Sequence, residues 1–437
     1  MGKETINVGL IGFGTIGAGV VKILQDNAGI IRERLGSELR LTRIADKDIE
    51  TDRGVTAGKA VAFSTDAGDI INDSDIDIVV ELIGGYEPAR SFVMAALEKG
   101  KRVVTANKAL LAVHGAEIFE KAADSGSDIG FEASVGGGIP VIRAIKEGLS
   151  ANNLGTIDAI INGTANYILT EMTNKGGDFQ TVLKRAQELG YAEADPTFDI
   201  EGVDSAHKLA ILASLAFGTK VVFEDIHTEG ISDISKMDID YATELGYKIK
   251  LLAIAKNSDG EIEARVNATM IPKGALLSNV EGVLNAVYVT GDAIGPTMYY
   301  GPGAGMMPTA SAVVGDIIEL SRDIINGISG RVPPLGYKIL KDLKMKDIGE
   351  VISKYYLRFS IVDSPGVLSK ISGILGAHNI SISSVLQKGR HEEKAVPLVI
   401  ITHEAQEKNL RHALTEIDKL DVVMDSTKVI RIEEKLS

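Results

Sequence analysis

The sequence predicts an α/β protein of three parts, and three features of its pattern support this. In the first 150 residues, short apolar runs alternate with helical patterns, which is typical of a parallel sheet covered by helices on both faces. The runs are residues 6–11, 39–45, 77–82 and 102–105. Residues 150–310 mix helical and alternating patterns, so a mixed α/β domain is expected there. From residue 355 the patterns follow the order β-α-β-β-α-β, a split βαβ unit.

Residues that start and stop helices and strands mark the elements of the first part. A helical pattern over residues 16–35 follows the first strand, and Asp46 ends the second. Pro88 begins a helix that stops at Gly100, since proline fits the first turn of a helix and glycine fits its end. A later helix over residues 310–325 is expected to return to this part.

The remaining elements are predicted from the same patterns. In the middle part, helices are expected over residues 167–175, 178–189, 203–217 and 242–245, and strands over residues 262–270 and 287–289. In the last part, strands are expected over residues 356–362, 381–387, 396–402 and 427–432, and helices over residues 366–377 and 405–417. These patterns predict one domain of residues 1–136 and 305–340, a second of residues 137–304, and a third of residues 354–437.

Composition excludes several kinds of chemistry and of partner. The chain has 437 residues and no cysteine, so disulfides, thiolate catalysis and cysteine-held zinc or iron–sulfur sites are excluded. Its 46 lysines and arginines against 60 aspartates and glutamates give a net charge of −14, which weighs against nucleic acid as a partner. No uncharged apolar run approaches the roughly 20 residues of a membrane span. We therefore expect a soluble, cytoplasmic protein with neither a nucleic-acid nor a membrane partner.

The first strand ends in a glycine motif that predicts a dinucleotide site. Gly12-Phe13-Gly14-Thr15-Ile16-Gly17 fits G-x-G-x-x-G and lies between a strand and a helix, as a Rossmann-type fold requires. The first glycine permits the turn, the second lets a pyrophosphate approach, and the third lets helix and strand pack. The positive end of the helix then faces the phosphates. All six residues are candidate cofactor contacts, and the alternative is a glycine-rich turn without a ligand.

Residues after the second strand leave the cofactor open between NAD and NADP. Asp46 can bind a ribose 2′-hydroxyl, which favours NAD. Lys47 and Arg53 can meet a 2′-phosphate, which favours NADP. The alternative for all three residues is a solvated turn.

A segment in the middle part resembles the signature of homoserine dehydrogenases. The segment is residues 186–208, and its fixed positions are filled by Ala186, Gly190, Asp195, Pro196, Asp199, Gly202, Asp204 and Lys208. Residues 103–108 and 132–140 also resemble segments of that family, so the likeness covers about residues 5–330. The resemblance implies reversible, NAD(P)H-dependent reduction of L-aspartate 4-semialdehyde to L-homoserine, in the biosynthesis of threonine, methionine and isoleucine.

The resemblance also implies roles for single residues. Asp204 and Lys208 stand four residues apart on one helix face, which by spacing alone indicates a surface ion pair. In the family, the lysine at the position of Lys208 moves the proton during hydride transfer, and Lys108 is a second candidate. The expected substrate contacts are Gly190, Glu193, Asp199, Asp204 and Lys208, and further cofactor contacts are Thr105, Lys108 and Gly303.

A glycine run predicts a cation site. Gly136-Gly137-Gly138 lets backbone carbonyls turn inward, and a monovalent cation binds such oxygens. By resemblance, a sodium ion is held at Glu132, Val135, Gly137 and Ile139. The alternative is a hinge between domains. The histidines show no ligand spacing, so His207 is expected to be structural and zinc to be absent.

The last part resembles an ACT domain, a ferredoxin-like regulatory fold. Its recognisable segments are residues 363–368 and 379–382. The resemblance implies a homo-oligomer, a dimer or a tetramer, and an amino-acid effector, for which threonine is the expected ligand. The residues expected to bind it are Asp363, Gly366, Asn379 and Ile380. The alternative is a dimerisation module without a ligand. A chain ending at Leu343 is expected to keep its activity and to lose threonine inhibition.

A second hypothesis is a non-catalytic protein that senses a dinucleotide and an amino acid through the same domains. The complete set of Glu193, Asp204 and Lys208 argues against it, because a sensor needs no proton carrier. Without cysteine, the chemistry is expected to be direct hydride transfer rather than thiolate attack on a carbonyl.

Overall fold

The chain divides into two compact units. The computed structural model describes residues 3–258, 260–388 and 395–436. Unit 1 comprises residues 1–163, 204–226 and 283–343, and unit 2 comprises residues 164–203, 227–282 and 344–437. The predicted division into three domains stays a prediction.

Unit 1 is built on a six-stranded parallel sheet with the strand order β3-β2-β1-β4-β5-β6. The strands are β1 (Thr5–Ile11), β2 (Glu38–Ala45), β3 (Ala62–Ser64), β4 (Ile78–Glu81), β5 (Arg102–Thr105) and β6 (Ile129–Gly130). This is the order of a doubly wound dinucleotide-binding sheet, in which the chain reverses direction across the sheet between β1 and β4. The predicted Rossmann-type fold is confirmed.

Helices cover this sheet and complete its core. They are α1 (Thr15–Asp26), α2 (Ala28–Leu35), α3 (Gly68–Ile71), α4 (Ala89–Glu98), α5 (Lys108–Asp124) and α12 (Met306–Ile325). The single helix predicted over residues 16–35 is wrong, because Asn27 leaves helical geometry with a ψ of 12° and divides it. Helix α12 does return to the first part, since Ala310, Val313 and Ile317 join the core of β1 and α1.

Three antiparallel strands and a buried helix complete unit 1. The strands are β7 (Leu154–Ile160), β11 (Leu284–Gly291) and β12 (Gly295–Pro302), with β11 paired to both others. Strand β7 was not predicted, because Asp158 interrupts its apolar run. Helix α10 (Val203–Phe217) has the predicted bounds, and every side chain from Asp204 to its end is buried. The short helices are α6 (Val141–Arg143), η1 (Glu132–Ser134), η2 (Ala144–Gly148) and η3 (Phe223–Asp225).

Unit 2 contains one sheet with the strand order β9-β10-β18-β14-β16-β15. These strands are β9 (Tyr247–Ser258), β10 (Glu261–Pro272), β18 (Val423–Ile432), β14 (Ile352–Val362), β16 (Ala395–Thr402) and β15 (Ile382–Gln387). Strand β18 pairs with β14 on one side and, through Arg431 and Ile432, with β10 on the other. The last part of the chain therefore continues the sheet that β9 and β10 begin.

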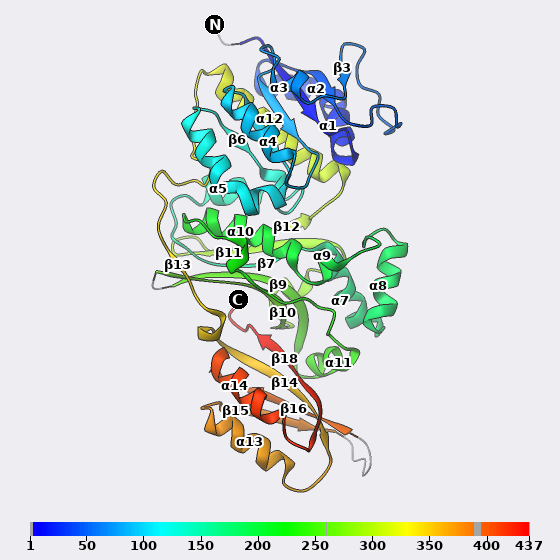
Figure 1. Ribbon diagram of the computed structural model, residues 1–437, viewed down its shortest axis with the longest axis vertical. Coiled ribbons are helices and arrows are strands. Elements are labelled where there is room, and N and C mark those ends of the chain that lie inside the picture. Colours follow the sequence, from blue (N-terminus) through cyan, green and yellow to red (C-terminus); the bar gives the residue numbers. More distant parts are fainter. Residues whose placement is uncertain (1–2, 259, 389–394, 437) are drawn as a thin grey trace. The chain divides into compact units, whose positions relative to one another are not determined.

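The last part has the predicted order β-α-β-β-α-β, which is the ferredoxin-like ACT arrangement. Helices α13 (Val367–Ala377) and α14 (Glu407–Ile417) pack on one face of β14 and β16 (Figure 1). Tyr355, Phe359 and Leu398 form the centre of their shared core.

The other helices of unit 2 precede this sheet or lie beside it. They are α7 (Gly163–Lys175), α8 (Phe179–Glu188), α9 (Thr197–Ile200), α11 (Lys236–Glu244), η4 (Leu276–Asn279) and η5 (Ile348–Glu350), with short strands β8 (His227–Thr228), β13 (Lys344–Met345) and β17 (Ala405–Gln406). Helix α11 begins six residues before the predicted start at residue 242, because Ser235 and Asp238 form a capping box. Within the described part of the chain, no helix has the length and apolar content to cross a membrane.

Candidate functional site

The glycine turn after β1 has the geometry that a pyrophosphate needs. Gly12 has a φ of +101°, and a Cβ there would lie 2.7 Å from backbone atoms of Leu82. A Cβ on Gly17 would lie 2.2 Å from the Gly12 carbonyl oxygen, so only glycine lets α1 pack so closely on the turn. A Cβ on Gly14 would meet nothing within 4 Å. Packing therefore requires glycine at positions 12 and 17. Gly14 faces open space at the N-terminus of α1, where a phosphate can bind.

A pocket of about 510 Å³ adjoins this turn. Asp46, Lys47 and Arg53 line it, together with Gly12 and Gly14. The Asp46 carboxylate accepts hydrogen bonds from the backbone N–H groups of Phe13 and Asp48, so it also stabilises the turn. Arg53 donates to Asp48 at 3.0 Å, while its buried Nε has no hydrogen-bond partner among the residues that the structure describes.

A second group of polar side chains surrounds the buried carboxylate of Asp204, near the start of α10. Lys208 Nζ donates to Asp204 Oδ2 and to the Ile161 carbonyl, both at 2.7 Å. Lys108 Nζ forms an ion pair with Asp204 Oδ1. Asn162 Nδ2 donates to Asp204 Oδ2 at 2.8 Å. One carboxylate thus contacts two ammonium groups that are a hundred residues apart in the sequence.

The elements of unit 1 place these side chains. Asn107 caps α5 by accepting from the Leu110 N–H at 3.1 Å, so Lys108 begins that helix. Thr105, at the end of β5, is fully buried, and its hydroxyl donates to Glu81 at 2.6 Å. Asn162 follows β7 by two residues. Strand ends and helix starts therefore meet at the Asp204 carboxylate.

The electrostatics of this group keep Asp204 ionised. Burial alone would raise the pKa of its carboxyl, but the charges of Lys208 and Lys108 and their hydrogen bonds hold that pKa well below its ordinary value. A permanent negative charge between two lysines fixes both ammonium groups in place. A lysine held in this way can donate a proton to a carbonyl oxygen and, once neutral, accept one from a hydroxyl group.

Sequence comparison identifies the family of this chain. A family model described as "Homoserine dehydrogenase" matches residues 140–318, and "Homoserine dehydrogenase, NAD binding domain" matches residues 12–132. "ACT domain" matches residues 355–422. The homoserine dehydrogenases of Neisseria gonorrhoeae and Pseudomonas aeruginosa are each 46% identical to this chain, covering 98% and 99% of it and 99% of their own lengths.

The chain belongs to the homoserine dehydrogenase family. The predicted resemblance is confirmed, and the chain is an NAD(P)-dependent oxidoreductase. Solved structures agree with this. The crystal structure of a homoserine dehydrogenase from Thiobacillus denitrificans has a TM-score of 0.94 and 47% identity, covering 99% of each chain. A hyperthermophilic archaeal homoserine dehydrogenase in complex with NADPH has a TM-score of 0.61 and 27% identity, covering 72% of this chain and 97% of that one.

In this homoserine dehydrogenase, the loop before α12 lies against the glycine run. A Cβ on Gly137 would lie 2.5 Å from the Gly303 carbonyl oxygen, and the Gly138 N–H donates to the Pro302 carbonyl at 3.3 Å. A Cβ on Gly303 would lie 2.0 Å from Asn285 Nδ2. The predicted cofactor position at Gly303 and the predicted cation position at Gly137 are therefore in direct contact.

The Glu132 side chain is engaged by a helix rather than by a site for a cation. Its two carboxylate oxygens accept from the Ile142 and Arg143 N–H groups, both at 2.8 Å, and so cap α6. Burial and the neighbouring Asp316 carboxylate raise the pKa of Glu132 to about 7. Burial likewise raises the pKa of Asp316 to about 6. From Glu132, the carbonyl is thus the oxygen that suits a cation.

The other predicted cation ligands lie in the same turn. Val135 is buried and extended, Gly137 has a φ of +56°, and the Ile139 carbonyl accepts from the Val141 N–H at 2.8 Å. Among the side chains that the structure describes, no group of three or more His, Cys, Asp or Glu residues could hold a metal ion. His207 is buried and packs against Phe223, with ring centroids 4.2 Å apart.

The remaining predicted substrate contacts lie in unit 2. Gly190 follows α8 with a φ of +74°, and Glu193 is exposed. Asp199 lies on α9, where Thr164 Oγ1 is 3.1 Å from its carboxylate and 2.6 Å from the Tyr191 carbonyl oxygen. Thr164 therefore ties α9 to the turn that carries Gly190 and Glu193.

The predicted effector residues occupy two turns of the ACT domain. Asp363 follows β14, and Gly366 precedes α13 with a φ of +90° and open space around it. Asn379 has a φ of +59°, which is rare for a residue with a side chain. Ile380 is buried in the ACT core, so only its backbone is available to a ligand.

Sequence reasoning missed three asparagines, one in contact with Asp204, one at the start of α5 and one against Gly303. Asn162 carried no signal, because its strand was not predicted. Asn107 is a recognisable N-cap residue before a helix, and that signal could have located the start of α5. Asn285 was also missed, and its Oδ1 is buried beneath Gly303 without a hydrogen-bond partner.

Proposed function

We propose that Lys208, Asp204 and Lys108 form the proton-transfer group with which this chain interconverts L-aspartate 4-semialdehyde and L-homoserine. The contact of one buried carboxylate with both lysines supports this. The nicotinamide supplies the hydride. Lys208 gives a proton to the carbonyl oxygen during reduction and takes it back from homoserine in the reverse direction, with Lys108 as the second candidate.

In this proposal Asp204 positions both lysines. Its ionised carboxylate holds Lys208 from within one helix and Lys108 from the start of another. The substrate amino acid contacts Glu193, Asp199 and Gly190 in addition, as the resemblance implies. Carboxylates suit the substrate because they can bind its ammonium group.

We favour NADP over NAD as the cofactor. The Asp46 carboxylate already accepts two backbone N–H groups, while Lys47 and the unpartnered Arg53 Nε line the same pocket. A 2′-phosphate at this place would meet both basic residues, in addition to the Asp48 carboxylate that Arg53 already contacts.

Three further features belong to the proposal. The sodium ion would be held by backbone oxygens of residues 132–139, which the left-handed Gly136 and Gly137 support. An amino-acid effector, for which threonine is the candidate, would bind at the open turn before α13. A homo-oligomer, dimer or tetramer, would form as in other ACT proteins, and the product would serve threonine, methionine and isoleucine biosynthesis.

Initial-rate kinetics test the proposal. The purified chain should reduce NADP⁺, and NAD⁺ less efficiently, when supplied with L-homoserine. Lys208→Ala should lower kcat by about 10²- to 10⁴-fold, the usual contribution of a positioned acid or base. Lys220→Ala removes an exposed lysine just beyond the same helix and should leave kcat unchanged. A wild-type chain that binds the dinucleotide yet never oxidises homoserine would refute the proposal.

A further inference from the structure

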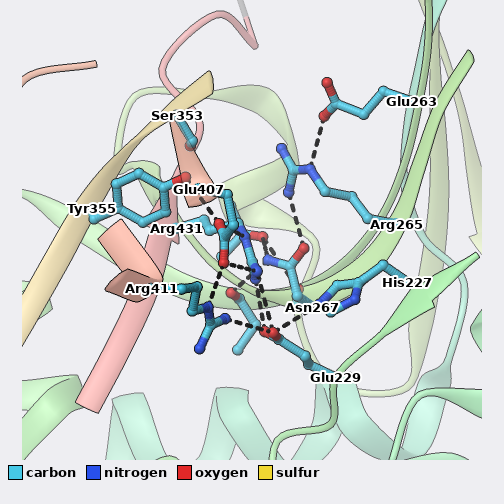
Figure 2. Close-up of polar contacts among 12 residues, drawn as sticks. His227, Glu229, Glu263, Arg265, Asn267, Ser353, Tyr355, Glu407, Arg411 and Arg431 are labelled. Carbon is cyan, nitrogen blue, oxygen red and sulfur yellow. Dashed lines mark hydrogen bonds and ion pairs between the residues drawn. The ribbon is translucent and has the colours of Figure 1, made fainter. Parts of the chain in front are cut away.

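A buried arginine joins two carboxylates in unit 2 (Figure 2). Arg431 lies on β18, and its side chain is only 2% exposed. It donates to the two oxygens of Glu229 at 2.7 and 3.2 Å, and to the two oxygens of Glu407 at 2.8 and 3.0 Å. Glu407 belongs to the ACT domain, whereas Glu229 directly follows β8. Two bidentate contacts on one guanidinium fix the plane of both carboxylates.

Neighbouring side chains complete this group. Arg411 donates to both Glu229 and Glu407, at 3.1 and 2.8 Å. His227 Nε2 lies 2.8 Å from Glu229, and the Tyr355 hydroxyl donates to Glu407 at 2.9 Å. Burial would raise the pKa of Glu229, but hydrogen bonds from His227 and Arg431 hold it well below its ordinary value. Glu229 is therefore a carboxylate fixed by three basic side chains.

The backbone around Glu229 is packed tightly on the end of α9. The Ile231 N–H donates to the Ile200 carbonyl at 2.8 Å. A Cβ on Gly230 would lie 2.4 Å from that same oxygen, and a Cβ on Gly202 would lie 3.3 Å from the Glu229 carbonyl oxygen. Residues 229–231 and residues 200–202 are therefore in close backbone contact, and a side chain on Gly230 would not fit between them.

Residues 200–202 connect two proposed substrate contacts. Asp199 lies on α9 directly before this segment, and Asp204 lies on α10 directly after it. Residues 200–203 are thus the whole of the chain between the two aspartates.

We propose that Glu229 and Arg431 are positioning residues for the amino-acid substrate: the last strand of the ACT domain fixes the link between Asp199 and Asp204. The proposal rests on the substrate roles proposed above for those two aspartates. Arg431 is buried, and without Glu229 part of its guanidinium would lose its hydrogen-bond acceptors, so the contact favours one arrangement of the two segments. Displacement of β18 would thus shift the segment that joins Asp199 to Asp204. The ACT domain could change substrate binding in this way.

Two conservative variants and one control test the proposal. Glu229→Gln keeps the shape of the side chain and removes its charge, and Arg431→Lys keeps the charge and removes the bidentate geometry. Lys256→Met is the control, because Lys256 on β9 also pairs with the tail, but through Glu433 at 2.6 Å instead of through Glu229. The readouts are the KM for homoserine, the KM for NADP⁺, kcat, and hydrogen exchange of the Ile231 amide.

The expected result is a change confined to the substrate. Glu229→Gln and Arg431→Lys should raise the homoserine KM about tenfold, within the range of measured couplings between linked sites. The KM for NADP⁺ should stay constant, and the Ile231 amide should exchange faster. Lys256→Met should change none of these values.

Other results would overturn the inference in recognisable ways. If both variants lower kcat and thermal stability but leave the homoserine KM unchanged, Glu229 and Arg431 have only a structural role. If one variant fails to fold, the other supplies the same readouts. If the wild-type chain binds NADP⁺ but does not oxidise homoserine, the proposed function fails. Hydrogen exchange of the Ile231 amide then still tests the link, and equal exchange in wild type and Glu229→Gln refutes it.

Discussion

Alanine substitutions at Gly14 and Gly17 should separate dinucleotide binding from folding. A Cβ on Gly17 would lie 2.2 Å from the backbone oxygen of Gly12, so helix α1 would have to move by about 1 Å to restore ordinary contact. Overpacking of this kind costs about 1–3 kcal/mol of unfolding free energy. Gly14 has a φ of −71° and open space around it, so alanine fits there without strain. That change should leave stability equal or raise it by up to about 1 kcal/mol.

Gly14→Ala should weaken dinucleotide binding, although it should not lower the free energy of unfolding. A methyl group there would fill the open space at the N-terminus of α1, where a phosphate is expected. We expect NADPH affinity to fall at least about tenfold, which corresponds to about 1.4 kcal/mol. Urea denaturation measures the free energy of unfolding, and fluorescence titration measures the affinity for NADPH. A Gly14→Ala chain that binds NADPH as wild type does would refute the assignment of this turn to the phosphates. A Gly17→Ala chain of unchanged stability would refute the packing argument.

Two further predictions concern unit 2. A chain ending at Leu343 should lose thermal stability and homoserine oxidation, because it lacks both the strand that pairs with β10 and Arg431, the partner of Glu229. A melting temperature and an oxidation rate equal to those of the full chain would contradict this. Burial, with the nearby charge of Lys248, lowers the pKa of Lys250 from 10.5 to about 8, and its ammonium group donates to the uncharged Asn166 and the Val280 carbonyl. Between those pH values the unfolded chain binds the extra proton, so stability should rise with pH by up to about 3 kcal/mol. Urea denaturation at pH 8 and pH 10 should show this rise in wild type and a smaller one in Lys250→Met, and equal rises would exclude Lys250 as the cause.

Local patterns in the sequence located the parts of the site that local geometry builds. The glycine motif could be interpreted because strand, turn and helix follow one another within Thr5–Asp26, and Asp204 and Lys208 share one helix. The contact of Lys108 with Asp204 spans 96 residues of sequence, and no spacing rule predicts it. Only the family resemblance indicated Lys108. Asn162 was invisible to both approaches.

The expectation of a removable tail stays a prediction, and one contact that the sequence did not indicate weighs against it. The near-independent pattern of residues 354–437 correctly predicts an ACT fold, but its last strand pairs outside that fold. Arg431 could be assigned to a strand from its neighbours, whereas its partner Glu229 lies 202 residues earlier. Propensity and periodicity predict the secondary structure of a segment, but they contain no information on which distant charged residue its side chains will contact.

The separation of Glu229 from Arg431 also has a consequence during synthesis. At about 5–20 residues per second, roughly 10–40 s pass between the translation of Glu229 and that of its partner. Throughout that interval Glu229 has no guanidinium from β18 to fix it beside the link between Asp199 and Asp204. The dinucleotide turn, by contrast, depends on β1, α1, Asp46 and Leu82, which all lie within the first 82 residues. A nascent chain can thus acquire its nucleotide-binding turn early, while the ordering of its amino-acid contacts waits until β18 has been made.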